Sequence, residues 1–395
     1  MTHWRSAILH SVIRRFAALL VLAAPIALSG ATTGAASVLR HREARTLTMP
    51  ALATARAEEE RVESAVVLVV LDGVRWQEVF DGVDRTLARQ RGVSSPWANP
   101  VDLMPNLHRL IDAEGLAIGA PGHGGEITAS GPQFISMPGY IEIFTGKPDP
   151  GCFRNDCRPT PMRTIADAVR DSGETGDVAV VTSWPNIARA MSAEPGFVLT
   201  AGRKLVDRED LLRSDAPTGR LLDEGARAPS FPGQGDYRPD VFTSRLALRR
   251  LAVSRPRFLF VGLGDADEYA HRSDYAGYLQ AVHASDAFLG DLTTLLRSMG
   301  ARGRHTTVLV TADHGRAHNF TDHGARYPES GRVWLVAAGA DVAERGLVAA
   351  SRHTLSDVAP TVLALLGITE IAGAARMSLE PEHAAAPIPE IIAQR

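Results

Sequence analysis

Four stretches of the chain are almost continuously apolar and are bounded by polar residues, over 64–72, 177–184, 257–265 and 306–315, and 332–339 resembles them. Unbroken apolar runs of this kind are typical of strands buried on both faces of a parallel sheet. Helical stretches lie between them, over 104–116, 162–171, 240–254, 274–298 and 355–366. The alternation predicts an α/β fold, a three-layer α/β/α sandwich around a mainly parallel central sheet.

The flanks of this pattern have a different character. Basic residues up to Arg15, an apolar run from Phe16 to about Leu28 and the small residues that follow predict a secretory signal peptide over 1–35. The apolar run is shorter than the roughly 20 residues that a membrane anchor needs. We therefore expect an exported protein without a stable membrane span, with a linker over 36–62, one domain over 63–385 and an insertion at 200–238, near the edge or mouth of the sheet.

Composition narrows the function classes. A chain of 395 residues that is 45% hydrophobic and 22% charged suits a globular enzyme, and its net charge of -3 without a basic run argues against nucleic-acid binding as the main function. The two cysteines, Cys152 and Cys157, predict a disulfide in an exported protein. A zinc knuckle is the alternative, but two thiols without a nearby histidine are a poor ligand set. The oligomeric state is left open.

Carboxylates follow three of the buried runs, at Asp72, Asp265 and Asp313. In open α/β sheets ligands bind at the carboxyl ends of the strands, so these side chains are expected to meet at one edge. A single aspartate there could equally be a helix cap. Imidazoles accompany them, and the combined candidate ligands are Asp72, Asp267, His271, Asp313, His314 and His323. This mixed oxygen and nitrogen set suits two divalent ions, zinc in the first place, with manganese as the alternative.

Ser136 is the candidate nucleophile. It follows an apolar stretch and precedes Pro138, which suits the first turn of a helix, where the helix dipole favours an alkoxide. A nearby metal would activate the hydroxyl further. A serine before a helix is more often only an N-cap, so the prediction depends on the ligands around it.

Five segments, in this order, resemble the alkaline phosphatase superfamily, and especially its nucleotide pyrophosphatase/phosphodiesterase-like and phosphopentomutase-like branches: VVLDGVRWQ, SMPGYIEIFTG, DADEYAH, TADHGRAH and DHGARYPESGRVWL. The resemblance runs from about 64 to 368. It implies an alkaline phosphatase-like fold with Asp72, Ser136, Asp313 and His314 around one metal. The other metal would be held by Asp267, His271 and His323, with His318 and His353 as reserves.

The resemblance also implies that Asn155 contacts a phosphoryl oxygen of the substrate. Monoesterases of the superfamily need additional positive charge at the phosphate, and Arg154 and Arg316 are the candidates. We expect an exported two-metal hydrolase of small phosphoric esters (a phosphodiester, pyrophosphate or phosphomonoester) that acts through metal-activated Ser136 and a phosphoseryl intermediate.

Three alternatives stay open. A sulfatase-like hydrolase would need arginine at the position of Tyr140, four residues after the nucleophile. A phosphosugar mutase of the same superfamily would need substrates that export removes from reach. A non-catalytic binding homologue would have to have lost a ligand or the nucleophile, yet all seven positions carry competent side chains.

Overall fold

The computed structural model describes residues 63–173, 177–192, 195–339, 342, 346–368 and 385–392. The predicted signal peptide and linker lie outside the described residues. Among the helices that are described, none combines the length and the apolar character that a membrane crossing requires.

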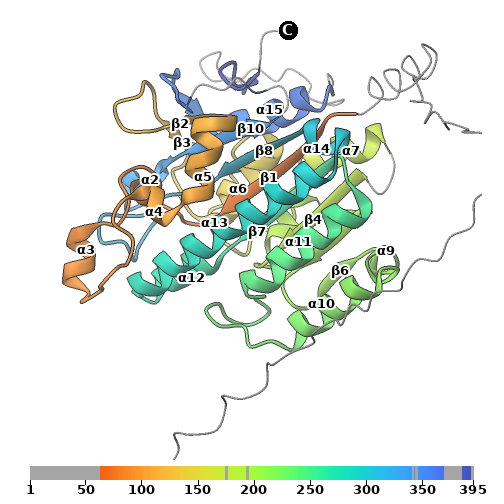
Figure 1. Ribbon diagram of the computed structural model, residues 1–395, viewed down its shortest axis with the longest axis horizontal. Helices are drawn as coiled ribbons and strands as arrows, with labels where there is room; N and C mark the ends of the chain where they lie inside the picture. Colours follow the sequence, from red (N-terminus) through yellow and green to blue (C-terminus); the bar gives the residue numbers. More distant parts are fainter. Residues whose placement is uncertain are drawn as a thin grey trace, which may run out of the picture. The chain divides into compact units, whose positions relative to one another are not determined.

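A nine-stranded sheet forms the centre of the molecule, in the order β11-β2-β10-β8-β1-β7-β4-β5-β6 (Figure 1). Its five central strands, β8 to β5, are parallel, whereas β10 and β6 run antiparallel to their neighbours. The bounds are β1 Ala65–Leu71, β2 Gly115–Ile118, β4 Val178–Thr182, β5 Val198–Ala201, β6 Leu205–Asp207, β7 Phe258–Leu263, β8 Thr306–Thr311, β10 Leu335–Gly339 and β11 Gly346–Leu347. A small second sheet joins β12 (His353–Thr354), β3 (Ile127–Thr128) and β9 (Arg332–Val333).

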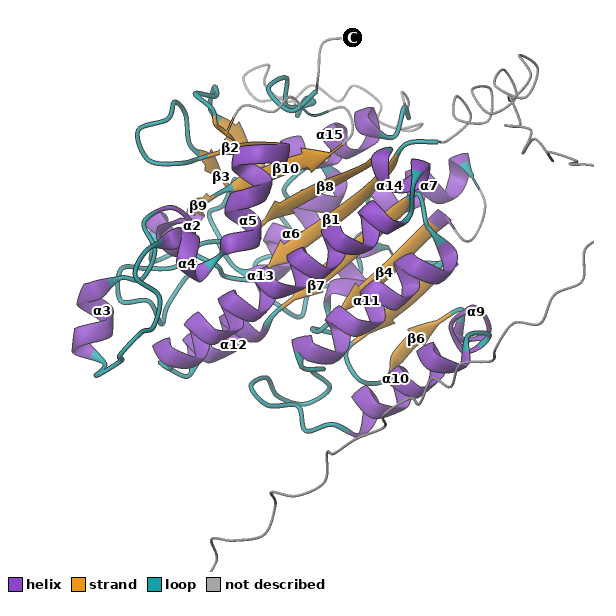
Figure 2. Cartoon of the chain, in the orientation of Figure 1, coloured by secondary structure: helices purple, strands orange, loops and turns teal. Residues whose placement is uncertain are grey.

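Helices cover both faces of the large sheet (Figure 2). On one face α11 and α13 pack side by side with α5 next to α13, and on the other α15 packs against α6 and α7. The bounds are α2 Trp76–Phe80, α3 Arg85–Gln90, α4 Pro100–Leu103, α5 Pro105–Arg109, η1 Leu110–Glu114, α6 Ser136–Thr145, α7 Ile165–Ser172, α8 Ile187–Met191, α9 Glu209–Arg213, α10 Ala216–Arg227, α11 Asp240–Ser254, α12 Asp265–His271, α13 Tyr275–Ser298, α14 Ala301–Arg304, η3 Pro328–Gly331, η4 Leu355–Asp357 and α15 Val358–Leu365. The predicted three-layer α/β/α fold is confirmed.

Several short elements differ from the sequence prediction. The helix expected over 104–116 is divided between α5 and η1 and ends at Glu114, because Gly115 already begins β2. A Cβ at Gly115 would lie 1.9 Å from the carbonyl oxygen of Ala337, so glycine lets β2 lie close to β10. The segment 200–238 contributes β6, at the edge of the sheet, and α9 and α10.

A buried ion pair ties α2 to α13. Arg75 and Glu78 are 2% and 0% exposed and pair with each other, and the Arg75 Nε–H donates to Glu78 Oε2 (2.8 Å). Glu78 also accepts hydrogen bonds from the hydroxyls of Tyr275 (2.8 Å) and Tyr278 (3.1 Å). Four polar groups from two helices therefore depend on one carboxylate.

Glu78→Gln should lower the free energy of unfolding by about 3–5 kcal/mol, because it removes the carboxylate that pairs closely with the buried Arg75 charge and leaves only Asp84, at 3.7 Å and 32% exposed. Denaturant titration of the purified protein measures this loss. Glu114→Gln is the matched control: Glu114 pairs with Arg109 but is 33% exposed, so its loss should stay below about 1 kcal/mol. Equal effects of the two substitutions would contradict the prediction.

Candidate metal centre

Three aspartates lie at the same edge of the sheet because β1 pairs in parallel with both β7 and β8. Asp72 directly follows β1, and Asp313 lies two residues after β8. Asp267 lies in the first turn of α12, just after β7. Asp265, the other strand-end aspartate, accepts a hydrogen bond from the Tyr237 hydroxyl (2.8 Å) and anchors the start of α11 through the Asp240 N–H (3.2 Å).

The first candidate ligand group consists of Asp72, Asp313 and His314, whose ligand atoms lie within 4.8 Å of one another. All three side chains are buried. His314 Nε2 lies 3.6 Å from Asp72 Oδ1 and 3.4 Å from Asp313 Oδ2. Ser136 Oγ completes the group, at 3.4 Å from Asp72 Oδ1 and 3.3 Å from His314 Nε2.

The second group contains Asp267, His271 and His323. His271 Nε2 lies 3.1 Å from Asp267 Oδ2 and 3.2 Å from His323 Nε2. Asp267 and His323 also come within 4.8 Å of His314. The His314 and His323 rings stack, with centroids 4.0 Å apart. The two groups therefore adjoin.

Hydrogen bonds select which ring nitrogens can bind a metal. His314 Nδ1 lies 2.8 Å from the Gly315 carbonyl oxygen, and His323 Nδ1 lies 3.0 Å from that of Phe134. A carbonyl can only accept, so both Nδ1 atoms carry the proton and both Nε2 atoms keep a lone pair. His314 therefore has one nitrogen, Nε2, that can bind a metal, and we assign it to the Asp72 group. His271 is the third member of the group of Asp267 and His323.

The spacing of these atoms suits bound cations. A tetrahedral zinc ion with ligands at about 2.0–2.1 Å places them about 3.3 Å from one another. Within each group the contacts given above range from 3.1 to 3.6 Å. Asp313 Oδ2, which is buried, has no hydrogen-bond partner among the described residues. The donor set and its one unpaired oxygen therefore fit two divalent ions.

The electrostatics of the protein alone are unfavourable at this edge. Burial, and repulsion from Asp313 and Asp267, raise the pKa of Asp72 well above its usual range. Burial and Asp267 raise the pKa of Asp313 to about 7. Burial also opposes charge on His314 and lowers its pKa to about 4, which keeps the imidazole neutral. Cations would remove this repulsion and bind neutral imidazoles without displacing a proton.

Arg316 compensates only one of the carboxylates. Burial opposes ionisation of Asp267, but Arg316 beside it holds the pKa of this carboxyl well below the usual range. Arg316 is 2% exposed; it pairs with Asp267 Oδ1 and donates to the carbonyl oxygens of Asp267 (3.1 Å) and Thr321 (2.7 Å). Both Nη groups are used in this way, and the buried Nε–H has no hydrogen-bond partner among the described residues, so Arg316 positions a candidate metal ligand.

Two glycines allow the ligands to come so close. Gly73 has a φ of +62°, and a Cβ there would lie 2.4 Å from Asp267 Oδ1. A Cβ at Gly139, in α6, would lie 2.4 Å from the carbonyl oxygen of Asp313. The first glycine gives room to a ligand of the second group. The other lets the helix that carries Ser136 pack against the end of β8.

Tyr140 is a site residue that sequence reasoning used only to argue against a sulfatase. Its side chain is fully buried, and its hydroxyl donates to Asp72 Oδ2 (3.1 Å). It therefore orients a metal ligand from one turn beyond Ser136. The spacing of four residues along a helix, which places both side chains on one face, was the available signal.

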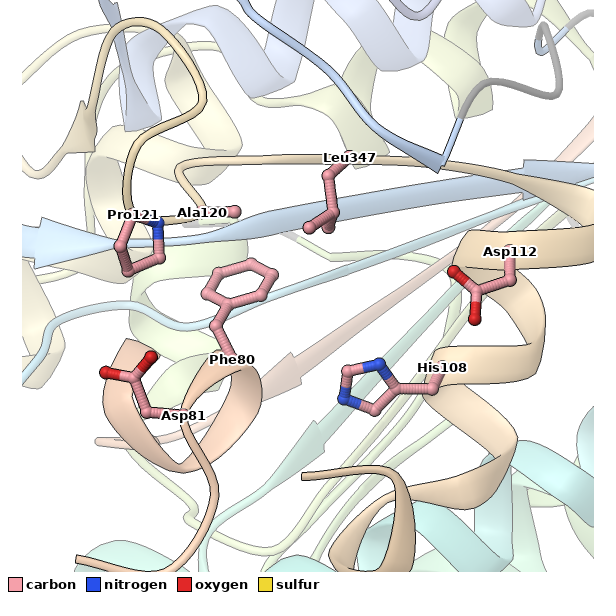
Figure 3. A pocket seen from close by; sticks show the side chains of 7 residues that line it. All are labelled: Phe80, Asp81, His108, Asp112, Ala120, Pro121 and Leu347. Carbon is pink, nitrogen blue, oxygen red and sulfur yellow. The ribbon is translucent and has the colours of Figure 1, made fainter. Parts of the chain in front are cut away.

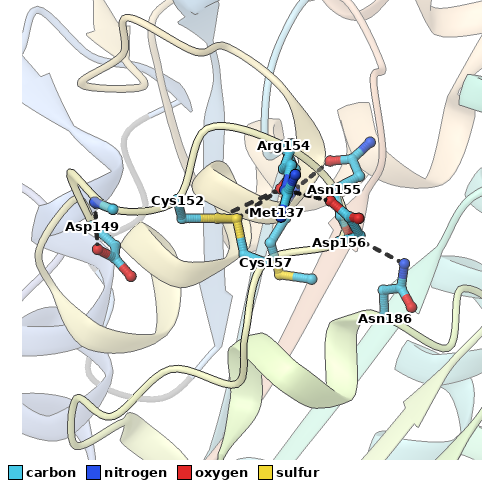
Figure 4. Close-up of a disulfide and its surroundings, with 9 residues drawn as sticks. Met137, Asp149, Cys152, Arg154, Asn155, Asp156, Cys157 and Asn186 are labelled. Carbon is cyan, nitrogen blue, oxygen red and sulfur yellow. Dashed lines mark hydrogen bonds and ion pairs between the residues drawn. A yellow bond between two sulfur atoms is a disulfide. The ribbon is translucent and has the colours of Figure 1, made fainter.

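Asn155 lies beside Ser136, in the loop closed by the predicted Cys152–Cys157 disulfide, which is present (Figure 4). The Met137 N–H donates to Asn155 Oδ1 (3.0 Å), so the amide Nδ2 is the group left to donate to a substrate. The neighbouring Arg154 is exposed and pairs with Asp156 (2.8 Å). It does not line the cavity around Ser136.

The two reserve histidines lie outside both ligand groups. His353 lies in β12 of the small sheet and pairs with Asp357 (3.3 Å) and with Glu390 (3.1 Å), which belongs to the C-terminal segment. His318 is exposed.

A cavity of about 190 Å³ opens at the ligand groups and is lined by Asp72, Ser136, Asn155, Trp184, Tyr237, Gly264, Asp267, Glu268 and His271. A second cavity, of about 150 Å³, is lined by Phe80, Asp81, His108, Asp112, Ala120, Pro121 and Leu347 (Figure 3). None of its residues belongs to a candidate metal group within the described chain. The candidate catalytic cavity is therefore the one that Ser136 lines.

A family model described as the Metalloenzyme superfamily matches residues 245–370. Phosphopentomutase of Methylorubrum extorquens is 25% identical over 70% of both chains. A solved structure of a protein in the alkaline phosphatase superfamily, from Vibrio parahaemolyticus, covers 78% of this chain and 67% of its own with a TM-score of 0.50 at 16% identity. The expected resemblance to the alkaline phosphatase superfamily is confirmed.

Other similarities point to the same superfamily. The 2,3-bisphosphoglycerate-independent phosphoglycerate mutase of Natronomonas pharaonis is 27% identical over 44% of this chain. The match spans only about a third of that mutase, 32% of its length. Sulfatases are among the similar solved structures, at 14–15% identity, which shows a shared fold alone. The chain thus has the fold of a superfamily of metal-dependent enzymes.

Purified protein should contain close to two zinc ions per chain by elemental analysis, with manganese as the alternative. His323→Ala and Asp267→Ala should each lose mainly one ion, because the Asp72 group remains complete. His318→Ala is the matched control and should keep both. Full occupancy and full activity in His323→Ala would remove His323 from the site.

Gly73→Ala should weaken the second ion about 10–100-fold, the range seen when residues that orient ligands are changed, since its Cβ displaces the Asp267 carboxylate. Competition with a chromogenic chelator measures this affinity. Gly92→Ala is the control, because Gly92 has nearly the same φ (+64°) but no atom within 4 Å of the added Cβ. It reproduces the backbone strain without the clash. Equal metal affinities in the two variants would refute the steric role of Gly73.

Proposed function

We propose that this protein is an exported, two-metal hydrolase of phosphoric esters in which Ser136 is the nucleophile. The single observation that supports this best is the position of Ser136 Oγ, at the first residue of α6 and 3.3–3.4 Å from ligand atoms of the first metal group. When bound, two divalent cations would polarise the phosphoryl oxygens and lower the pKa of the serine hydroxyl. Export rests on the N-terminal sequence pattern.

The protein's own groups would perform the reaction in two steps. Ser136 Oγ attacks phosphorus, so that a Ser136–phosphorus bond forms while the bond to the leaving oxygen breaks, and the leaving oxygen takes up a proton. Water then attacks the phosphoseryl group, which releases the phosphate and returns the hydroxyl to Ser136. Asn155 Nδ2 would donate to a non-bridging oxygen in both steps, and the N-terminus of α6 favours the negative charge there.

The lining of the cavity favours a phosphodiester over a phosphomonoester. No lysine or arginine is among the lining residues described. Arg316 is used by Asp267, and Arg154 pairs with Asp156 away from the cavity. The second negative charge of a monoester would therefore find no protein cation, whereas a diester carries one charge. Tyr140, where sulfatases need arginine, argues against sulfate esters.

A phosphosugar mutase is the second candidate, supported by the match to phosphopentomutase over 70% of both chains. Such an enzyme returns the phosphoryl group to another hydroxyl of the sugar in place of water. Incubation with pentose phosphates tests it: a mutase moves the phosphoryl group to another hydroxyl of the sugar, a phosphomonoesterase releases phosphate, and a phosphodiesterase leaves these monoesters unchanged.

Ser136→Ala should keep the fold and most of the metal, because Asp72, Asp313 and His314 still surround the first ion. Its kcat toward nitrophenyl diesters should fall by several orders of magnitude, with a residual rate from positioning and electrostatics. Ser136→Thr, which keeps a hydroxyl, should retain more activity and is the matched comparison.

The assay uses a panel of nitrophenyl monoesters and diesters, with a nitrophenyl sulfate as control. Wild-type rates in Ser136→Ala would reduce Ser136 to a helix cap. A preference for the sulfate would overturn the proposed reaction class.

A further inference from the structure

One wall of the catalytic cavity is distinct from the metal groups. It consists of Trp184, Tyr237 and Glu268. Trp184 follows β4 and Glu268 lies in the first half of α12, directly after β7. Because β4 and β7 are adjacent and parallel, both side chains lie at the sheet edge that also carries Asp72 and Asp267. A substrate whose phosphorus reaches Ser136 would place part of its ester substituent against this wall.

Glu268 is the acidic side chain of this wall. It is half-buried, and its side chain makes no hydrogen bond or ion pair with the residues that the structure describes. The two basic side chains that follow it act on it only at a distance: His271 pairs with Asp267 (3.1 Å), and Arg272 donates to the Pro232 carbonyl oxygen (2.6 Å) and lies over the Phe231 ring, 5.1 Å from its centroid. The adjacent Asp267 has Arg316, so Glu268 is the acidic group of the cavity that neither a protein cation nor a metal group accounts for.

The cation behind this wall, the buried Arg238, donates to Thr200 Oγ1 (2.7 Å) and Thr243 Oγ1 (3.1 Å) and makes no ion pair with Glu268. Asp240 accepts hydrogen bonds from Ser183 Oγ, from the Gly264 N–H (2.9 Å) and from the Asp265 N–H (2.8 Å). Tyr237 is 1% exposed and its hydroxyl donates to Asp265, so it contributes a fixed surface without a free donor. Asp240 therefore adds negative charge behind Glu268, and a positively charged group of a substrate would offset it by pairing with this carboxylate directly.

Trp184 gives this wall an aromatic surface. Its side chain is half-buried, and its indole N–H makes no hydrogen bond to the described residues. An aromatic ring beside an unpaired carboxylate is the arrangement that binds alkylammonium groups, through cation–π attraction and charge together. A neutral hydroxyl could donate to Glu268, but it would leave the negative charge uncompensated.

We propose that Glu268 and Trp184 form a subsite for an alkylammonium group, so that the preferred substrates are phosphodiesters whose ester substituent carries a choline- or ethanolamine-like cation. This specificity rests on the proposed hydrolase function of the same cavity. The cation also explains a feature of the lining: the substrate, and not the protein, supplies the positive charge near its own phosphate.

The test compares two nitrophenyl phosphodiesters of nearly equal shape. One carries a choline group and the other its uncharged isostere, a 3,3-dimethylbutyl group, and both are assayed with the zinc-loaded enzyme at pH 8–9. The wild type should prefer the choline ester by about tenfold in kcat/KM, mainly through KM, as expected for a cation–π contact joined by a carboxylate. Choline itself should inhibit competitively.

Glu268→Gln should abolish most of this preference, measured as the ratio of kcat/KM for the choline ester to kcat/KM for the uncharged isostere. Trp184→Leu should reduce the preference in part. Glu209→Gln is the control; Glu209 is 55% exposed on α9 and pairs with Arg213, so the preference should persist. Calorimetry should detect the binding of choline to the metal-loaded Ser136→Ala protein. This binding should be lost in Ser136→Ala/Glu268→Gln.

Each outcome separates the subsite from the proposed function. Hydrolysis of both diesters at equal rates by the wild type, or an unchanged preference in Glu268→Gln, would overturn the subsite and leave the hydrolase intact. A 2-hydroxyethyl diester that is preferred over the uncharged isostere as strongly as the choline ester would mean that Glu268 recognises a hydrogen-bond donor. That result would also overturn the alkylammonium subsite. Failure to hydrolyse either diester, with a monoester cleaved, would overturn the diesterase assignment itself.

Discussion

Repulsion between buried carboxylates is the constraint on which the site depends. Asp72 and Asp313 lie at the ends of adjacent parallel strands, both essentially without solvent, and the pKa of each is raised by burial and by its acidic neighbours. A protein gains nothing in stability from such an arrangement alone. The arrangement has a physical reason when the folded chain holds these oxygens in place for cations, because the binding free energy of the cations offsets the repulsion. Metal binding should therefore contribute strongly to the stability of the sheet edge.

The residues around the ligands have a consistent role in this view. The Arg316 pair with Asp267, the hydrogen bond from Tyr140 to Asp72 and the Gly73 N–H donated to Asp313 Oδ1 (3.1 Å) each fix one carboxylate in one orientation. The partners of His314 and His323 are backbone carbonyls, so they fix the tautomers without adding charge. Preorganisation of this kind is costly in folding but removes the cost of ordering the ligands when a cation binds.

The sequence was sufficient for the parts of the molecule that local patterns determine. The continuous apolar runs predicted β1, β4, β7 and β8, and the Asp and His residues that follow them were found because strand ends converge in a parallel sheet. Strands of two to four residues, such as β3 and β11, were missed because they are too short to show periodicity. Their positions are set by neighbours far away in the chain, as Gly115 shows against Ala337.

The roles of Arg316, Tyr140 and Glu268 also depended on long-range contacts. From the sequence, Arg316 was a candidate for phosphate binding, and only its contact with Asp267, 49 residues away, assigns it to a ligand. Glu268 was not singled out at all, because an acidic residue on an amphipathic helix is usually solvated. Its significance comes from what surrounds it: an aromatic side chain just after the adjacent strand β4, and no direct ion pair among the described residues.

The cavity thus has two halves of different origin. The ends of β1 and β8, together with the start of α6, supply the proposed nucleophile Ser136 and the first candidate ligand group. The ends of β4 and β7, with α12, supply the wall of Trp184 and Glu268. Side chains on the second half can change without disturbing the first, except at Asp267 and His271, which belong to the second candidate ligand group. This separation gives a physical reason why one arrangement of metal ligands can serve enzymes with different substrates: the chemistry is set where the strands force the carboxylates together, and the selectivity is set on the opposite wall, where only packing and charge constrain the choice of residue.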